Sequence, residues 1–86
     1  MFGQSKKLKD EIIDIGRKLH DLRLVAGTSG NLSARIDKNN ILITATGTAL
    51  GDLRYDDIIK VDLTNEEDLK RPRLTSEFPL HRFIYE

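Results

Sequence analysis

Two runs in which apolar residues recur at every second position, residues 31–36 and 41–45, most constrain how this chain can fold. A period of two predicts half-buried β-strands, because successive side chains of a strand point to opposite faces of its sheet. The four residues between the runs are Asp37-Lys38-Asn39-Asn40. Asp and Asn favour turns because their side chains bond to nearby backbone groups. We therefore expect the two runs to form an antiparallel hairpin.

A helix is expected before the hairpin, over roughly residues 5–24, because apolar residues recur there at spacings of three and four. That stripe consists of Leu8, Ile12, Ile15, Leu19 and Leu22. After the hairpin, Asp52 can cap a single helical turn over residues 53–55, and a third strand is expected over 58–63. Residues 65–73 are polar and predict a loop.

A last helix is expected to open at Thr75 or Ser76, both good N-cap residues, with Pro79 in its first turn. Leu80, Phe83 and Ile84 give this helix an apolar side, and the helix stops at Glu86 before that side has been used. The sequence thus suggests a chain that ends in the middle of a fold.

The composition excludes several classes of function. Fourteen basic residues balance fourteen acidic ones, so no net charge steers the chain to nucleic acid or an anionic membrane. The absence of cysteine excludes disulfides and thiolate metal sites, and the two histidines, His20 and His81, offer no zinc site by themselves. No apolar run predicts a leader or a membrane span, and we expect a cytoplasmic chain of one small, marginally stable domain.

Three corners rich in small, hydrogen-bonding residues carry the functional signal: residues 27–31, 44–48 and 74–77. If they meet, hydroxyls, an amide and backbone N–H groups would converge on one anion, most simply a phosphate. Glu77 would then be a carboxylate placed for general acid/base work. Each corner is also compatible with an ordinary turn or helix cap. The cluster Lys70-Arg71-Pro72-Arg73 reads as a solvated loop or as a minor attraction for an anionic substrate.

The three corners belong to four short motifs that follow one another along the sequence. They are Gly27-Thr28-Ser29-Gly30-Asn31-Leu32-Ser33, Ile43-Thr44-Ala45-Thr46-Gly47, Asp57-Ile58-Ile59-Lys60-Val61-Asp62, and Thr75-Ser76-Glu77 followed by Leu80-His81 and Ile84-Tyr85. In this order they resemble the N-terminal part of the class II aldolase/adducin family, from residue 8 to the end. The resemblance implies that residues 1–86 are the incomplete N-terminal portion of a three-layer α/β/α domain with a mostly antiparallel central sheet, truncated after the second major helix.

The resemblance also implies roles for individual residues. Glu77 corresponds to the family's catalytic acid/base, which exchanges a proton with an enediolate carbon while zinc holds the enediolate oxygens. The implied reaction is retro-aldol cleavage of a ketose phosphate such as fuculose phosphate. The family's enzymes are tetramers with active sites between subunits, so a homo-oligomer is implied. The positions that correspond to phosphate-binding residues are Gly30, Asn31, Thr46, Gly47, Thr75 and Ser76.

The family's zinc ligands are histidines beyond the position where this sequence ends. We therefore expect no metal ligands in this chain, no bound zinc and no aldolase activity from the 86 residues alone, as in a shortened reading frame or fragment. Related activities stay open, namely a sugar-phosphate epimerase or dehydratase. A non-catalytic, adducin-like binding or assembly module is a further alternative, as is a fragment that associates with a complementary chain.

Overall fold

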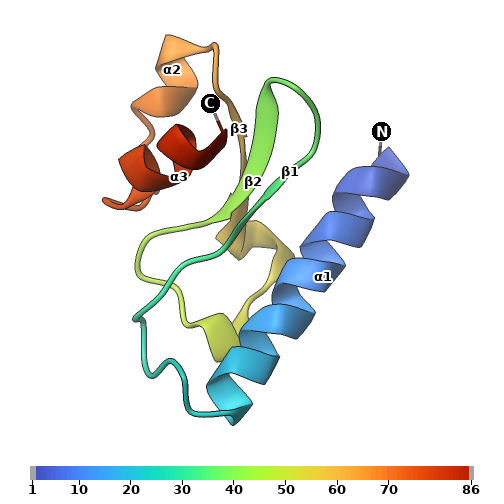
Figure 1. Cartoon of the computed structure of the whole chain (residues 1–86), viewed down its shortest axis with the longest axis vertical. Helices are drawn as coiled ribbons and strands as arrows, with labels where there is room; N and C mark the ends of the chain where they lie inside the picture. Colours follow the sequence, from blue (N-terminus) through green and yellow to red (C-terminus); the bar gives the residue numbers. More distant parts are fainter. Residues whose placement is uncertain (1, 86) are drawn as a thin grey trace.

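The computed structural model describes residues 2–85. Within that range a long helix comes first, a three-stranded sheet follows, and two shorter helices come last (Figure 1). Met1 and Glu86 lie outside the described residues, and with Glu86 so does the predicted end of the last helix. The elements are α1 (Phe2–Asp21), β1 (Ser33–Arg35), β2 (Asn40–Thr44), the 3-10 turns η1 (Leu50–Asp52) and η2 (Tyr55–Asp57), β3 (Ile58–Asp62), α2 (Glu66–Leu69) and α3 (Phe78–Tyr85).

The sheet is antiparallel throughout, in the order β1-β2-β3, which confirms the predicted hairpin and third strand. Ala34 lies opposite Leu42, and Leu42 lies opposite Lys60 on the other side. The hairpin turn is held as the sequence predicts, because the Asp37 carboxylate accepts hydrogen bonds from the backbone N–H groups of Asn39 and Asn40, each at 2.9 Å. β1 is shorter than the predicted 31–36 because pairing begins only at Ser33, and β3 ends one residue before the predicted end. β2 keeps the predicted length but begins one residue earlier, at Asn40.

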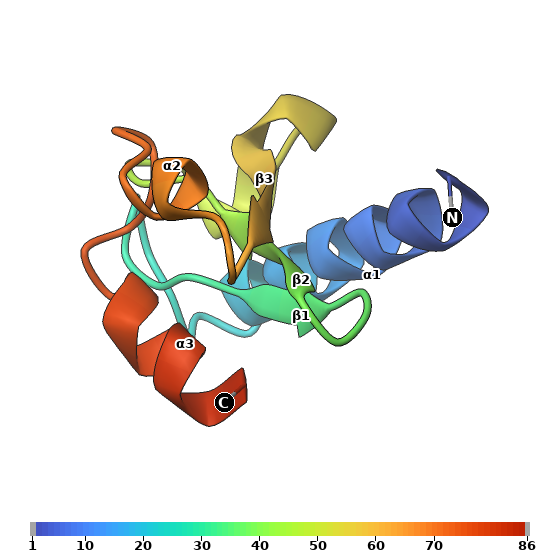
Figure 2. The ribbon, with the colours of Figure 1, turned by 90° about the horizontal axis from the view of Figure 1, so that it is seen from above.

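The sheet separates two apolar clusters, so helices lie on both of its faces (Figure 2). On one face Leu42 and Ile58 meet Ile12 of α1 and Leu50 of η1. On the other face Ile41, Ile43, Ala45, Ile59 and Val61 meet Phe78 of α3. β2 is the central strand and is buried on both faces, which explains the uninterrupted apolar run of Ile41, Leu42 and Ile43.

Gly16 lies on the side of α1 that packs against η1. A Cβ atom at Gly16 would lie 2.4 Å from the backbone oxygen of Leu50, so α1 approaches η1 more closely there than any side chain would allow. The buried side of α1 is therefore centred between Ile12 and Gly16. Ile15, which the sequence pattern places in the stripe, falls at the flank and is 47% exposed.

α1 also ends earlier than its sequence pattern predicts, at Asp21 instead of residue 24. Arg23 has a left-handed backbone conformation, with φ 60°. The N–H of Leu24 donates to the carbonyl of Leu19 at 2.9 Å, a bond pattern that closes helix ends and exposes Leu22 beyond the last turn. Left-handed arginine is uncommon, which is why the sequence does not signal this end.

Two other local predictions are wrong. The polar segment 65–73 contains the short helix α2, because Asn65 caps it by accepting the N–H of Glu67 at 2.9 Å and acidic residues fill the first turn. Asp52 does not cap a turn over 53–55. Instead, η1 ends at Asp52, and the Asp57 carboxylate accepts the N–H of Arg54 at 2.9 Å around η2.

α3 begins at Phe78, after the predicted start at Thr75 or Ser76, and Pro79 lies in its first turn as expected. Its inward side carries Phe78, which is buried against the sheet. Its outward side exposes Leu80, Phe83 and Ile84, which are 60%, 79% and 70% accessible to solvent. Among residues 2–85, no helix combines the length and the apolar character needed to cross a membrane.

Candidate functional site

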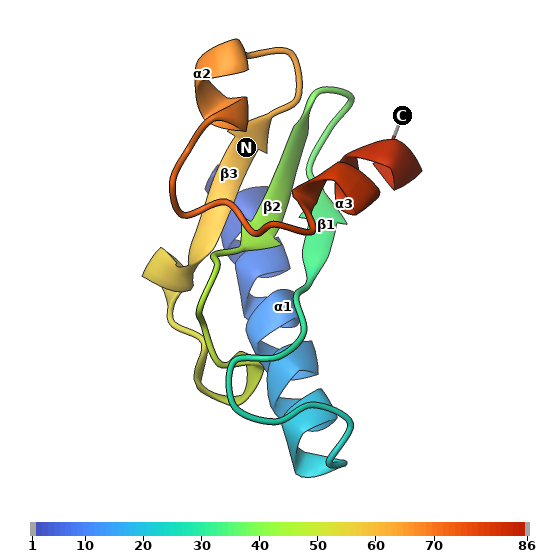
Figure 3. The same ribbon diagram turned by 90° about the vertical axis from the view of Figure 1, so that its left-hand side faces the viewer.

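The three predicted corners lie at the same end of the sheet, near the start of α3. The segment that leads into α3 crosses the sheet beside the end of β2 (Figure 3), and the N–H of Thr46 donates to the carbonyl of Arg73 at 2.7 Å. This bond ties the second corner to Arg73, the residue directly before the third corner. Within the third corner, the Thr75 hydroxyl accepts the N–H of Glu77 at 3.3 Å.

A direct side-chain contact joins the first corner to the third. Asn31 Nδ2 donates to Glu77 Oε2 at 2.6 Å, across 46 positions of sequence. Asn31 is half-buried and Glu77 is exposed, so the carboxylate lies at the surface with an amide donor beside it. The predicted acid/base and one predicted phosphate-binding residue are therefore neighbours.

The backbone at Gly30 and Gly47 has the left-handed conformation that glycine adopts without cost, with φ of 87° and 75°. At Gly30 a side chain would also crowd Val25 and Leu50, with contacts of 3.1 and 3.2 Å, whereas at Gly47 a Cβ atom would meet nothing within 4 Å. Gly47 and its neighbour Thr46 are exposed, as is Ser76. These loops are shaped by glycine and open to solvent at the end of the sheet where Glu77 lies.

A polar chain behind Asn31 was not predicted from the sequence. His81 Nε2 contacts Asn31 Oδ1, and His81 Nδ1 lies 2.6 Å from Ser33 Oγ. Ser33 Oγ in turn lies 2.8 Å from the hydroxyl of Tyr85. One sequence signal could have indicated these hydrogen bonds. Glu77, His81 and Tyr85 recur every four residues, a spacing that places side chains on one side of a helix.

Arg35 of β1 contacts Tyr85, the last of these hydrogen-bonded side chains. Its guanidinium donates to the backbone oxygen of Tyr85 and lies over the Tyr85 ring, 5.2 Å from the ring centroid. A guanidinium at this distance is attracted by the face of the ring. β1 and α3 are thereby connected through side chains along much of the length of α3.

Burial lowers the pKa of His81 below its ordinary value of 6.5, and the nearby Glu77 carboxylate offsets part of that effect. The neutral imidazole has one N–H donor and one acceptor nitrogen. Asn31 Oδ1 can only accept, so the hydrogen is assigned to Nε2. Nδ1 then accepts from the Ser33 hydroxyl, whose oxygen accepts from Tyr85.

The lowered pKa predicts that the folded chain loses stability in mild acid. Below pH 6.5 the unfolded chain protonates His81 while the folded chain resists, so the stabilisation present above pH 6.5 is lost as pH falls toward the lower folded pKa. Urea unfolding at pH 7.5 and pH 5.5 measures this loss. His81→Gln is expected to reduce it, whereas His20→Gln, at an exposed position, is expected to retain it. Equal acid sensitivity in the parent chain and in His81→Gln would contradict the prediction.

The basic cluster before α3 is engaged within the chain. Arg71 lies 3.0 Å from the carboxylate of Asp68, and Arg73 lies 3.7 Å from that of Asp57. Arg71 also donates to the backbone oxygen of Lys60 at 2.9 Å. These pairs favour the structural interpretation of the cluster over a role in attracting substrate.

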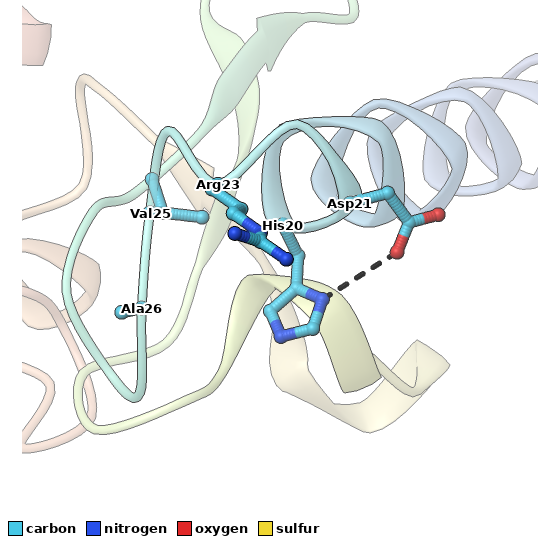
Figure 4. A pocket seen from close by; sticks show the side chains of 5 residues that line it. All are labelled: His20, Asp21, Arg23, Val25 and Ala26. Carbon is cyan, nitrogen blue, oxygen red and sulfur yellow. Dashed lines mark ion pairs between the residues drawn. The ribbon is translucent and has the colours of Figure 1, made fainter.

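A hollow of about 510 Å³ lies elsewhere, at the C-terminal end of α1 (Figure 4). His20, Asp21, Arg23, Val25 and Ala26 line it, and none of the predicted site residues does. His20 and Asp21 form an exposed pair at 3.5 Å. This hollow carries no group in common with the corner at α3, which remains the candidate site.

The described residues do not fit a zinc site. Within residues 2–85, no three His, Cys, Asp or Glu side chains are grouped so that they could hold a metal ion. The one histidine near Glu77 is His81, and both of its ring nitrogens already have partners. Any zinc serving Glu77 would thus need ligands other than those described here.

Comparisons with known proteins find sequences similar to this chain. A family model for the class II aldolase and adducin N-terminal domain matches residues 10–86. An L-fuculose phosphate aldolase of Methanocaldococcus jannaschii is 42% identical over 77 residues, covering 90% of this chain and 41% of that protein. A methylthioribulose-1-phosphate dehydratase of Pseudomonas paraeruginosa is 37% identical over 87 residues, covering 99% of this chain and 42% of that protein.

The chain thus spans about two fifths of the length of these curated relatives. The matched residues include all three corners and the Asn31–Glu77 contact that joins two of them. Through this domain, the chain belongs to the class II aldolase and adducin family.

Proposed function

We propose that this chain carries the phosphate-binding loops and the acid/base carboxylate of a sugar-phosphate lyase. The observation that carries the proposal is the contact of Asn31 Nδ2 with Glu77 Oε2. It joins a loop of small, glycine-shaped residues to the one carboxylate at the start of α3. The bond from Thr46 to Arg73 brings the second loop to the same corner. The proposed phosphate-binding residues are Gly30, Asn31, Thr46, Gly47, Thr75 and Ser76.

The chemistry of the corner fits an anion beside a proton-transfer group. The amide of Asn31 has two N–H donors, and only one is needed for Glu77. The other can face a phosphate oxygen, together with hydroxyls of Thr75 and Ser76 and the backbone N–H groups near the start of α3. The exposed carboxylate of Glu77 can take a proton from a carbon next to a carbonyl or return one to it.

The proposed reaction is retro-aldol cleavage of a ketose phosphate such as fuculose phosphate. As the carbon–carbon bond breaks, the neighbouring substrate hydroxyl loses its proton to a base and an enediolate remains. A proton must then be returned to the enediolate carbon, and we assign that return to Glu77 in its protonated form. In the family, zinc supplies Lewis-acid stabilisation of the enediolate oxygens. The residues of this chain described here do not hold that ion, so their share is to bind the phosphate and move the proton.

The relative from Pseudomonas paraeruginosa supports a second candidate, dehydration of a ketose phosphate. Elimination of water next to a carbonyl begins with removal of a proton from carbon, the reverse of the protonation assigned to Glu77 above, and its substrate also carries a phosphate. The same corner would therefore serve either reaction. The two activities would differ in groups that contact the rest of the sugar.

The exposed side of α3 supports association of this chain with further protein, as in an oligomer. Leu80, Phe83 and Ile84 are largely accessible and adjacent on the helix. Such a cluster of large apolar side chains is typical of surfaces that pair with another protein surface. A purely structural, adducin-like module would use this surface without the acid/base, and the retained Glu77 favours the enzyme.

The phosphate site is tested by titrating the ¹⁵N-labelled chain with inorganic phosphate at constant ionic strength, with chloride as the reference. The backbone amides of Gly30, Gly47 and Ser76 are expected to shift together, with a dissociation constant on the order of 1 mM. Asn31→Asp, which places a negative charge at the site, is expected to weaken binding about tenfold, or about 1.4 kcal/mol.

The matched control is Asn39→Asp, which adds the same charge in the hairpin turn at the other end of β2. It is expected to leave the phosphate affinity within about twofold of the parent value, because exposed charges beyond about 10 Å are largely screened. Equal shifts with phosphate and chloride, or equal losses in the two Asp variants, would overturn the proposed phosphate site.

A further inference from the structure

The hydrogen-bonded side chains behind Asn31 are arranged so that they can fix the orientation of the Asn31 side-chain amide. An asparagine amide can face Glu77 with either its oxygen or its nitrogen, and the two orientations have opposite consequences. With Oδ1 toward the carboxylate, two acceptors would oppose each other. With Nδ2 toward it, at the observed 2.6 Å, the carboxylate gains a donor.

We propose that His81 is a positioning residue whose Nε2–H holds Asn31 Oδ1, so that the Asn31 amide nitrogen faces Glu77 and the anion beside it. This inference rests on the proposed function for the roles of Asn31 and Glu77. His81 does not touch the reacting atoms in this arrangement. It acts through Asn31, which lies between the two side chains.

The remainder of the polar chain determines which nitrogen of His81 carries the hydrogen. Ser33 Oγ lies 2.6 Å from Nδ1 and 2.8 Å from the Tyr85 hydroxyl. When the hydroxyls of Tyr85 and Ser33 donate inward, Nδ1 is an acceptor and the hydrogen of the neutral ring stays on Nε2. Arg35, over the ring of Tyr85, holds the outer residue in place.

The hydrogen bond from His81 to Asn31 can also form when the imidazole is charged. Protonated His81 donates from both nitrogens, and the Ser33 hydroxyl can rotate to accept from Nδ1 and donate to Tyr85. The bond from Nε2 to Asn31 is made in both states. The charged and titratable groups that face these hydrogen-bonded side chains are Glu77, directly before α3, Tyr85 on α3 and Arg35 on β1. The orientation of Asn31 therefore does not depend on the protonation state of His81.

The direct test is the ring tautomer of His81 in the full 86-residue chain, read from long-range ¹H–¹⁵N spectra at pH 7.5 without phosphate. We expect a single tautomer with the hydrogen on Nε2. His20, exposed beside Asp21, serves as the internal reference for a solvated imidazole. A hydrogen on Nδ1, or tautomer averaging in His81 equal to that in His20, would overturn the inference whether or not any variant folds.

A second measurement separates positioning from simple packing. In His81→Leu the side-chain N–H₂ of Asn31 is expected to exchange with water about tenfold faster, because Oδ1 has lost the donor that keeps Nδ2 against Glu77. His81→Gln retains a side-chain donor and is expected to restore most of the protection. The amide of Asn65, the cap of α2, is the reference within each sample.

Equal exchange rates for Asn31 in the Leu and Gln variants would show that His81 only packs, and would refute the positioning role. Retained amide signals of β2 and β3 establish that each variant is folded. These experiments contain no phosphate, so a failed phosphate titration with the expected tautomer refutes the anion site and leaves the hydrogen-bond device in place.

Discussion

Replacing Ile41 with alanine is expected to lower the free energy of unfolding by about 3 kcal/mol. Ile41 is fully buried in the central strand, where it meets Val61 across the sheet and packs in the cluster that includes Phe78. Removing its three carbons would leave a cavity in that cluster. Domains of this size have only about 5 kcal/mol of stability, so the variant should be close to unfolding at room temperature.

Urea unfolding followed by circular dichroism measures this change, with Ile15→Ala as the matched control. The control removes the same atoms from a side chain that is 47% exposed, and it is expected to cost less than about 1 kcal/mol. Similar losses at positions 41 and 15 would mean that α1 presents a different side to the sheet than the one described here.

Gly16→Ala is expected to destabilise the chain by about 2 kcal/mol, although alanine is the better helix former. A Cβ atom at position 16 would lie 2.4 Å from the backbone oxygen of Leu50 and 3.1 Å from Leu53 Cδ1. The oxygen belongs to backbone and cannot rotate away as a side chain could. Helix α1 must therefore separate from η1, which opens the cluster around Ile12 and Leu50.

The control for this substitution is Gly47→Ala, where backbone conformation is the only obstacle. A Cβ atom at Gly47 meets nothing within 4 Å, but its φ of 75° costs alanine about 1 kcal/mol. Thermal unfolding of the two variants should rank Gly16→Ala as the less stable. If Gly16→Ala is instead more stable than the parent chain, the close approach of α1 to η1 is incorrect.

Many residues of the candidate site can be predicted from the sequence, because the patterns that indicate them extend over only a few neighbouring residues. Glycines at corners and small hydroxyl residues before a helix indicate a place where backbone and side-chain donors are available. The residue types of the three corners suggested that they meet, and the resemblance to the aldolase family implied a role for Glu77 that stays a prediction. The contact of Glu77 with Asn31 needed the structure, because the two residues are 46 positions apart and no local rule joins them.

The hydrogen bonds among His81, Ser33 and Tyr85 also could not be predicted from local sequence patterns alone. His81 and Tyr85 share a helix side, which can be read from their spacing. Ser33 enters only because β1 lies under α3, and this depends on how the segment after α2 crosses the sheet. Taken alone, each of the three is an ordinary polar residue.

By itself the sequence determined the hairpin, the third strand, the first helix and the last one, because periodicity and turn chemistry act over a few residues. Tertiary structure decided which side of α1 is buried, since a backbone contact at Gly16 outweighs the apolar stripe that includes Ile15. It also decided that Asn31 meets Glu77 and His81. Contacts between distant segments are set by the packing of whole elements on the sheet, and periodicity within one element does not specify that packing.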